Sequence, residues 1–325
     1  MNLKIPASQI KGFNYHPSYS SCPFETWRCF DFEKISEELT RGKEYFPNFN
    51  TVRIWLSWNA FCRGYEVFLD RLDMVLEKCK QLGIYVMPVI FNRWHDPMVD
   101  CDGVYLEHIV PNTSWFDKYG DPFDKYLKCL MERFGDDDRI ICWDLCNEPF
   151  AFPFWQCEFA DKLFEIDINW LQSVYDKCKA YGAKQPLGIG EAGVLDLNRI
   201  DSCSDIFYTH MYFRTDDPFD QEGIAQFDHN VKLKLEQAKA LGKDLVPNEC
   251  CWGDYTDQRR AQRVKVTLET FKKHGIGYCL YALNYCDFPD LHDECDGAYS
   301  PDIGNLAFVT KDGKIRPGHE IVNEY

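Results

Sequence analysis

Short apolar runs recur along the chain and are separated by longer stretches that carry charged residues. Apolar runs of about four to eight residues are typical of strands buried on both faces, as in a parallel sheet that helices cover. These runs predict strands at residues 12–16, 51–56, 84–90, 139–145, 186–190, 205–210, 245–249 and 277–283.

Most of the stretches between these runs have helical periodicity. One apolar stripe with spacings of three and four consists of Phe68, Leu72, Val75, Leu76, Cys79 and Leu82. Several helices are predicted to end in the same way, with a glycine just before the next strand, because glycine tolerates the left-handed conformation that ends a helix. These glycines are Gly83, Gly182, Gly242 and Gly275.

The alternation of strands and helices predicts an α/β fold. Eight β/α units would form a single (β/α)8 TIM barrel with elaborated βα loops, and a doubly wound open sheet is the second possibility. The 325 residues exceed the roughly 250 of a typical barrel by an amount that loops can absorb. No linker or second composition interrupts the chain, so residues 1–325 are predicted to form one domain.

Two glutamates stand where predicted strands end. Asn147 and Glu148 follow an apolar run that stops at Pro149, and Glu249 ends the run 245–249. Because the strands of a parallel barrel all end at one rim, both acids are expected to converge there. A partly desolvated Glu can keep its proton near neutral pH, and a pair of carboxyls is what glycoside cleavage requires.

Other polar residues end the remaining runs. Arg53 lies in the second run, where a cation near the acids would keep one of them ionised. His210 and Tyr212 alternate at the end of the sixth run and point to the same side. Asn92 and His95 compete for the inward position after the third run, because the register there is ambiguous.

Aromatic residues and Asn14 complete the candidate set. Asn14 lies in the first run, Trp252 follows Glu249, and Tyr281 lies in the eighth run. The aromatic segment 150–155 predicts either a small core inside its own loop or a platform on which sugar rings stack.

Composition limits the partners and the location. The formal charge of −16 argues against nucleic acid and anionic membranes as partners. No apolar run has the length of a membrane span, and the first residues show no signal-peptide core. The 16 cysteines are scattered through a large domain that does not need disulfides, so we expect a reduced, cytoplasmic protein.

Taken together, these residues resemble the retaining glycoside hydrolases of clan A, and most of all family 5, the cellulase and mannanase family. The resemblance implies that Glu148 is the acid/base and Glu249 the nucleophile of a double displacement. It further implies a substrate site made by Asn147, Arg53, His210 and Tyr212. The family usually places a Trp on strand eight, where this chain offers Tyr281, and the residue before the strand-seven glutamate is Asn248 instead of a small one.

The expected substrate is a carbohydrate, a β-linked gluco- or manno-type oligosaccharide or glycoside, and no cofactor or metal is implied. One alternative is a metal-dependent sugar isomerase or epimerase barrel, with Glu148, Glu249, His210 and His95 as ligands. The other is a carbohydrate-binding barrel without catalysis. The sugar, the choice between exo and endo action, and the oligomeric state stay open.

Overall fold

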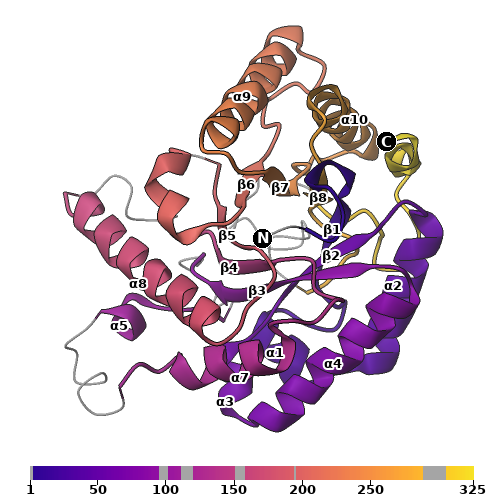
Figure 1. Ribbon diagram of the computed structural model, residues 1–325. Helices are drawn as coiled ribbons and strands as arrows, with labels where there is room; N and C mark the ends of the chain where they lie inside the picture. Colours follow the sequence, from indigo (N-terminus) through magenta and orange to yellow (C-terminus); the bar gives the residue numbers. More distant parts are fainter. Residues whose placement is uncertain (1–2, 95–101, 111–119, 151–157, 194, 288–304) are drawn as a thin grey trace.

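The protein is represented by a computed structural model that describes residues 3–94, 102–110, 120–150, 158–193, 195–287 and 305–325. Its centre is a parallel sheet that curls into a barrel (Figure 1). The strands follow the order β7, β6, β5, β4, β3, β2, β1, β8. They are β1 (Lys11–Tyr15), β2 (Thr51–Trp55), β3 (Tyr85–Asn92), β4 (Trp143–Asn147), β5 (Leu187–Glu191), β6 (Phe207–Met211), β7 (Leu245–Cys250) and β8 (Tyr278–Leu280).

The two ends of the sheet meet, because the Tyr281 amide just after β8 donates to the Cys250 carbonyl on β7 at 2.9 Å. Helices surround the strands (Figure 1). In chain order the described helices are α1 (Pro23–Arg28), α2 (Phe32–Tyr45), α3 (Trp58–Cys62), α4 (Tyr65–Gln81), α5 (Leu106–Ile109), α7 (Asp124–Phe134), α8 (Ala160–Ala180), α9 (Gln221–Ala240) and α10 (Asp257–His274). The (β/α)8 prediction is therefore confirmed, and the open doubly wound sheet is wrong. None of the described helices combines the length and apolarity that a membrane span would need.

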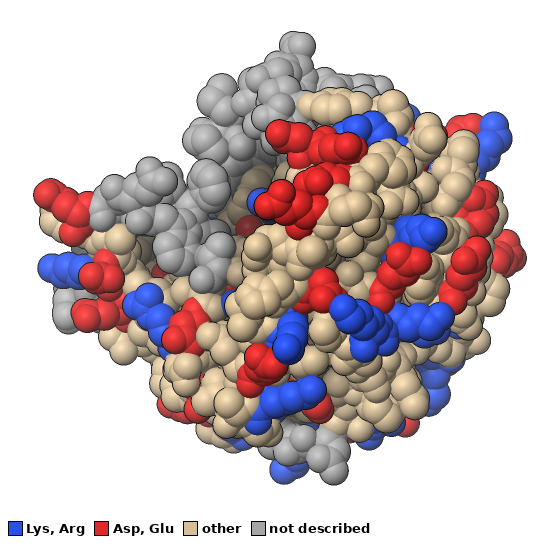
Figure 2. All heavy atoms as spheres, turned by 90° about the horizontal axis from the view of Figure 1, so that it is seen from above, with Lys and Arg blue, Asp and Glu red and all other residues tan. Residues whose placement is uncertain are grey.

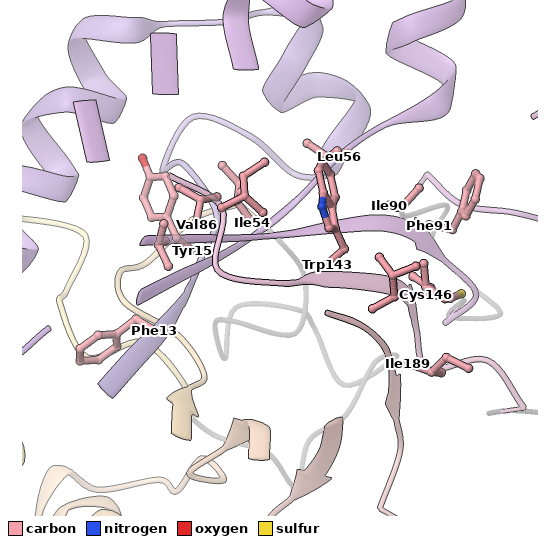
Figure 3. Close-up of a cluster of buried hydrophobic side chains, with 14 of the residues drawn as sticks. Phe13, Tyr15, Ile54, Leu56, Val86, Ile90, Phe91, Trp143, Cys146 and Ile189 are labelled. Atoms are coloured by element: carbon pink, nitrogen blue, oxygen red, sulfur yellow. The ribbon is translucent and has the colours of Figure 1, made fainter. Parts of the chain in front are cut away.

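Alternation along the strands divides the side chains between two environments. Phe13, Tyr15 and Ile54 belong to the apolar core between the strands and the helices (Figure 3). Full burial of each such side chain contributes roughly 1.5–3 kcal/mol. Asn14 and Arg53, which are register partners on β1 and β2, point the other way and bond across the barrel interior. Alternation thus places polar groups inside the barrel mouth and apolar groups under the helices.

The predicted helix ends are confirmed, and so is the helix stripe except for Leu82, which lies just beyond the helix and is half-buried. In α4 the side chains of Phe68, Leu72, Val75, Leu76 and Cys79 are buried. The glycines after α4, α8, α9 and α10 all have a positive φ, which a residue with a Cβ adopts only under strain. The values are 68° for Gly83, 109° for Gly182, 71° for Gly242 and 65° for Gly275.

Two strands differ most from their predicted ranges, and the others shift by one or two residues. The run 139–145 begins too early, because Ile140 makes only an isolated bridge with Val86 before β4 starts at Trp143. The run 277–283 is too long for β8. After Leu280 the backbone leaves the ladder, and the Ala282 amide donates to the Leu306 carbonyl instead. Apolar residues thus continue past the strand because a later segment of chain covers them.

Candidate active site

The structure brings the two glutamates together at the carboxyl ends of β4 and β7. His210, on β6, lies between them: its Nδ1 is 2.5 Å from Glu148 Oε1 and 3.3 Å from Glu249 Oε2. Ligand atoms of all three side chains lie within 4.8 Å of one another. Carboxyls about 5–5.5 Å apart suit a covalent double displacement, whereas a separation above about 6.5 Å leaves room for a water and suits direct inversion. A separation of at most 4.8 Å between these atoms is close to the distance that suits double displacement and well below the distance that suits inversion.

Two donors hold the carboxylate oxygens of Glu249 in place. The Arg53 guanidinium donates to Oε1 in a buried ion pair, and the Tyr212 hydroxyl donates to Oε2 at 2.8 Å. Only 7% of the Glu249 side chain is exposed. A carboxylate that accepts a charge-assisted bond on one oxygen and a phenol on the other has a fixed orientation. This environment suits a group that must stay ionised and aimed at one point.

Arg53 is the centre of a buried polar network. Its guanidinium donates to Asp144 Oδ2 at 2.7 and 3.0 Å, to Asn14 Oδ1 at 2.9 Å and to Asn147 Oδ1 at 2.8 Å. Burial alone would lower the pKa of Arg53, but Asp144 and Glu249 raise it above its ordinary value. The cation is thus permanent, and it fixes the position of Glu249.

Asn14 was predicted as a sugar ligand, and its surroundings contradict that role. Its side chain is fully buried. The oxygen accepts from Arg53, and the amide donates to the carbonyl oxygens of Asn248 and Leu280 at 2.9 and 3.2 Å. With both ends of the amide engaged inside the barrel, Asn14 positions Arg53 and does not reach a substrate.

The network includes two residues that strand alternation did not assign to the site. Asp144 accepts from Arg53 and from the Asn248 amide, the latter at 2.9 Å. The pairing register shifts between Asp144 and Asn147 on β4, and between β6 and β7 the register partner of His210 is Glu249, so that Asn248 is skipped. Such irregularities let neighbouring residues point into the same space, which a strict period of two forbids. The aspartate and the asparagine are therefore visible only in the structure.

Glu148 lies in a different environment from Glu249. It follows β4 with a φ of 43°, a left-handed conformation that non-glycine residues seldom adopt, and its amide donates to the Gly190 carbonyl at 2.8 Å. Burial raises the pKa of Glu148 to about 7, although the positive charges of Arg214 and Arg53 oppose the rise. Burial also lowers the pKa of His210 to about 4, so the imidazole is neutral near pH 7. Glu148 therefore exists as acid and as base near neutrality.

The third strand contributes Asn92. Its Oδ1 accepts from the Asn147 amide at 3.0 Å and from the Trp94 backbone amide at 3.2 Å. Asn147 is thus held between Arg53 and Asn92, which fixes which way its amide points. His95, the competing candidate, lies outside the described residues, as do residues 151–155 of the aromatic segment.

Aromatic side chains gather near the glutamate pair. Tyr281 is buried in a cluster with Trp55, and its ring centroid lies 6.1 Å from that of His16. Tyr212 packs against this cluster and meets Trp252 edge to face, with centroids 5.1 Å apart. The predicted residues Tyr281, Tyr212 and Trp252 therefore all lie beside the site. Trp252 is half-buried, whereas Tyr281 is buried.

The trio Glu148, His210 and Glu249 could also be considered as metal ligands, since their donor atoms lie close together. Arg53 and Tyr212 already donate to both oxygens of Glu249. A cation bound there would face the buried guanidinium, which opposes it electrostatically. The donor set fits proton transfer and nucleophilic attack by carboxyls better than it fits a divalent ion.

Comparison with known proteins identifies a family match and related sequences. Residues 37–287 match the family described as Cellulase (glycosyl hydrolase family 5). The chain is 24% identical over 306 residues to a probable mannan endo-1,4-beta-mannosidase A of Aspergillus oryzae, covering 88% of this chain and 72% of that protein. The match to the Aspergillus flavus protein of the same name is 24% over 190 residues, and it spans less than half, 44%, of that relative.

Solved structures agree in fold. The exo-beta-1,4-mannosidase Op5Man5 from Opitutaceae bacterium strain TAV5 superposes with a TM-score of 0.73 at 16% identity, covering 97% of this chain and 58% of that one. A GH5_18 protein from Streptomyces cattleya in complex with GlcNAc superposes at 0.77 with 16% identity, covering 97% and 79%. Since the family match extends over well over half of the residues, the chain belongs to glycosyl hydrolase family 5, the cellulase family.

Proposed function

We propose that the protein is a retaining β-glycoside hydrolase. The observation that carries the proposal is the contrast between two close carboxyls: Glu249 is paired with the Arg53 cation, while burial raises the pKa of Glu148 to about 7. One group suits a nucleophile that stays charged, and the other suits an acid that gives up and regains a proton.

The reaction follows in two steps. Glu249 attacks the anomeric carbon while Glu148 gives its proton to the leaving oxygen, which yields a glycosyl ester on Glu249 and a free alcohol. Glu148, now a carboxylate, takes a proton from water as the water oxygen attacks the same carbon. The ester bond breaks, Glu249 returns as a carboxylate, and two inversions give net retention.

Neighbouring residues position the reacting groups. Tyr212 keeps one oxygen of Glu249 in place, and Arg53 keeps the other. Asn147, fixed by Arg53 and Asn92, is the proposed partner of the sugar 2-hydroxyl. The neutral His210 contacts Glu148 at Nδ1, so it can donate to the carboxylate form that Glu148 adopts between the two steps.

We propose β-1,4-linked mannosides as the substrate class within the wider gluco- and manno-type range. Support comes from the relatives, since both Aspergillus proteins are named as mannan endo-1,4-beta-mannosidases and one structural neighbour as an exo-beta-1,4-mannosidase. The test is a panel of aryl β-mannoside, β-glucoside, β-galactoside and β-xyloside together with short β-1,4-linked oligosaccharides. Proton NMR of the first-formed product should show the β-anomer. Release of the α-anomer would contradict the retaining mechanism.

The same panel separates the alternatives. Turnover of any member excludes a barrel that only binds carbohydrate. Activity that survives an excess of chelator excludes the metal-dependent isomerase, whereas activity restored only by a divalent ion would favour it.

The rate should depend on pH through Glu148. Because the first step needs the protonated acid, and the pKa of that carboxyl is raised to about 7, kcat/KM should fall as the pH rises through about 7. Arg214→Met removes a cation that lowers this pKa, so its alkaline limb should move to higher pH. Lys125→Met, a substitution on α7, should leave the limb in place. A limb near pH 5 in the parent protein would contradict the assignment of Glu148.

A substitution of Gly190 on β5 would disturb the network around Arg53. A Cβ there would lie 2.7 Å from Asp144 Oδ2, 2.9 Å from Asn248 Nδ2 and 3.1 Å from an Arg53 nitrogen. Gly190→Ala should lower the free energy of unfolding by about 1–3 kcal/mol, and it should reduce kcat of the folded fraction by displacing Arg53.

Gly188→Ala is the matched control for this prediction. It lies on the same strand, and its added Cβ would meet the Ile206 carbonyl and the Tyr208 ring instead. It should destabilise the fold by a similar amount in a denaturant titration while kcat of the folded fraction is retained. Equal loss of kcat in both variants would mean that the network does not position the nucleophile.

We further propose that residues 1–325 act as one domain in a reducing, cytoplasmic compartment, on carbohydrate and with neither nucleic acid nor membranes as partners. In support, the cysteines in the described ranges are all free thiols, and acidic and basic groups are interspersed over the face seen in Figure 2. Alkylation under denaturing conditions without reductant should modify all 16 cysteines. Protection of several of them would contradict the compartment.

A further inference from the structure

A hollow lies beside the proposed catalytic centre, between the loop that follows β6 and the loop that follows β7. Its volume is about 410 Å³, large enough for a sugar unit. It is lined by Arg214, Thr215, Asp216, Trp252, Gly253, Asp254, Tyr255, Arg259 and Arg263. The mechanism above uses none of these residues to bind substrate.

Two aromatic rings that contact one another link the wall of the hollow to the nucleophile. Tyr212 donates to Glu249 at 2.8 Å, and its ring meets that of Trp252 at 5.1 Å. Trp252 in turn lines the hollow, and Tyr255, with 61% of its surface exposed, stands on the same loop. Exposed aromatic faces are surfaces on which pyranose rings stack, so a substrate bound at Glu249 can extend onto this wall.

Two of the three arginines in the hollow are already engaged. Asp254 accepts from Nε of Arg259 and from Nε of Arg263, both at 2.8 Å. The remaining donors of Arg263 reach the carbonyl oxygens of Phe213 and Thr215 at 3.1 and 2.6 Å. These two cations therefore hold the loops together, and Asp254 offsets part of their charge.

Arg214 is different. Within the described ranges it forms no hydrogen bond or ion pair, and its guanidinium is stacked 3.8 Å from the Trp252 ring and 4.9 Å from the Tyr212 ring. A guanidinium stacked on an aromatic ring keeps its donors free at the edge and aims them sideways. In a protein with a formal charge of −16, this is a positive group presented beside the reaction centre. Asp216, two residues further along the chain, is the exposed acid of the lining.

We propose that this hollow is a subsite for a sugar unit that carries an anionic group, and that Arg214 is the residue that selects it. The inference rests on the proposed glycosidase function and names its substrate class more closely. Tyr255, the exposed ring of the lining, supplies the stacking face, and the Arg214 fork pairs with two oxygens of the anion. A carboxylate and a phosphate ester both present two oxygens to such a fork. The experiment therefore compares the two anions directly.

The experiment compares β-1,4-linked manno- and gluco-oligosaccharides in three forms: neutral, oxidised at C6 to a carboxylate, and phosphorylated at O6. The quantity measured is the ratio of kcat/KM for the anionic form to that for the neutral form, because any change in the pKa of Glu148 cancels in the ratio. In the parent protein we expect a ratio of about ten or more at low salt that falls as salt is added. The form with the larger ratio identifies the anion.

Arg214→Met should reduce the ratio by about 5- to 50-fold, since a charge-assisted bond at a partly exposed site is lost. Arg214→Lys should retain part of it, and Asp216→Asn should increase it. The matched control is Lys125→Met, which removes an exposed cation stacked 3.9 Å from the Tyr65 ring on the outer helices and should leave the ratio unchanged. A ratio below one in the parent protein, or a ratio that Arg214→Met leaves intact for both anions, would overturn the proposal.

Binding separates this proposal from the proposed activity. In Glu249→Ala, calorimetric titration with the C6-carboxylate and neutral disaccharides should show tighter binding of the anion, and adding Arg214→Met should remove the difference. Hydrolysis of neutral substrates without any anion preference in binding or turnover would refute the subsite and leave the glycosidase intact. Anion preference in binding without hydrolysis of any β-glycoside would refute the activity and leave the subsite intact.

Discussion

Glu249→Ala should lose about 10⁵-fold or more in kcat for every substrate, whatever its leaving group, because the first step has no nucleophile without this carboxylate. The surrounding network remains largely in place, since Arg53 keeps Asp144, Asn14 and Asn147 as partners. The loss should therefore appear in turnover, with little change in the substrate affinity measured by titration.

Azide or formate should partly restore activity in the same variant. The deletion leaves space beside a cation, so a small anion can occupy it and attack the anomeric carbon of an activated aryl glycoside. One displacement from that face gives the α-glycosyl azide. The parent protein with azide is the control and should show no such product. A β-glycosyl azide from Glu249→Ala would mean that the two glutamates have exchanged roles.

Glu148→Ala should have an effect that depends on the leaving group. Substrates with poor leaving groups need protonation and should lose about 10²–10⁴-fold in kcat/KM. An activated aryl glycoside needs little protonation, so its first step should largely survive and the glycosyl-enzyme should accumulate as a burst. Steady-state rates over a series of phenol leaving groups, with pre-steady-state bursts, measure both.

Azide should rescue the second step of Glu148→Ala with retention, because Glu249 still forms the covalent intermediate and azide needs no general base. The limb of kcat/KM near pH 7 should disappear in this variant, since the group that produces it is gone. An equal loss for good and poor leaving groups, with the alkaline limb unchanged, would remove Glu148 from the role of acid/base.

Sequence patterns predicted the barrel because its signals are local. Each strand is a short apolar run, and each of the four predicted helix ends carries a glycine with positive φ. The strand-end rule then placed Glu148 and Glu249 on one rim without any knowledge of the loops. The barrel and the strand ends both follow from short local patterns, because the preference of the backbone for a strand or a helix end is encoded over a few residues.

The side chains that surround the two glutamates could not be predicted in the same way. Asp144 and Asn248 enter the Arg53 network through register irregularities in β4 and β7, which no alternation pattern reveals. Asn14 has the right position for a sugar ligand, and only its partners across the barrel show that it is fully engaged. Arg214 belongs to a loop, where side-chain direction follows from tertiary contacts with Trp252 and not from periodicity.

The central claim is that Glu249 forms a covalent bond with the sugar. A 2-deoxy-2-fluoro β-glycosyl fluoride of the preferred sugar tests it most directly, because the C2 fluorine slows both steps while the fluoride leaving group keeps the first step fast enough to accumulate the ester. Mass spectrometry of the intact protein should show one added fluoro-sugar, and peptide mapping should place it on Glu249. A label on Glu148 or on any other residue, or an unlabelled protein that releases the inverted product, would contradict the account.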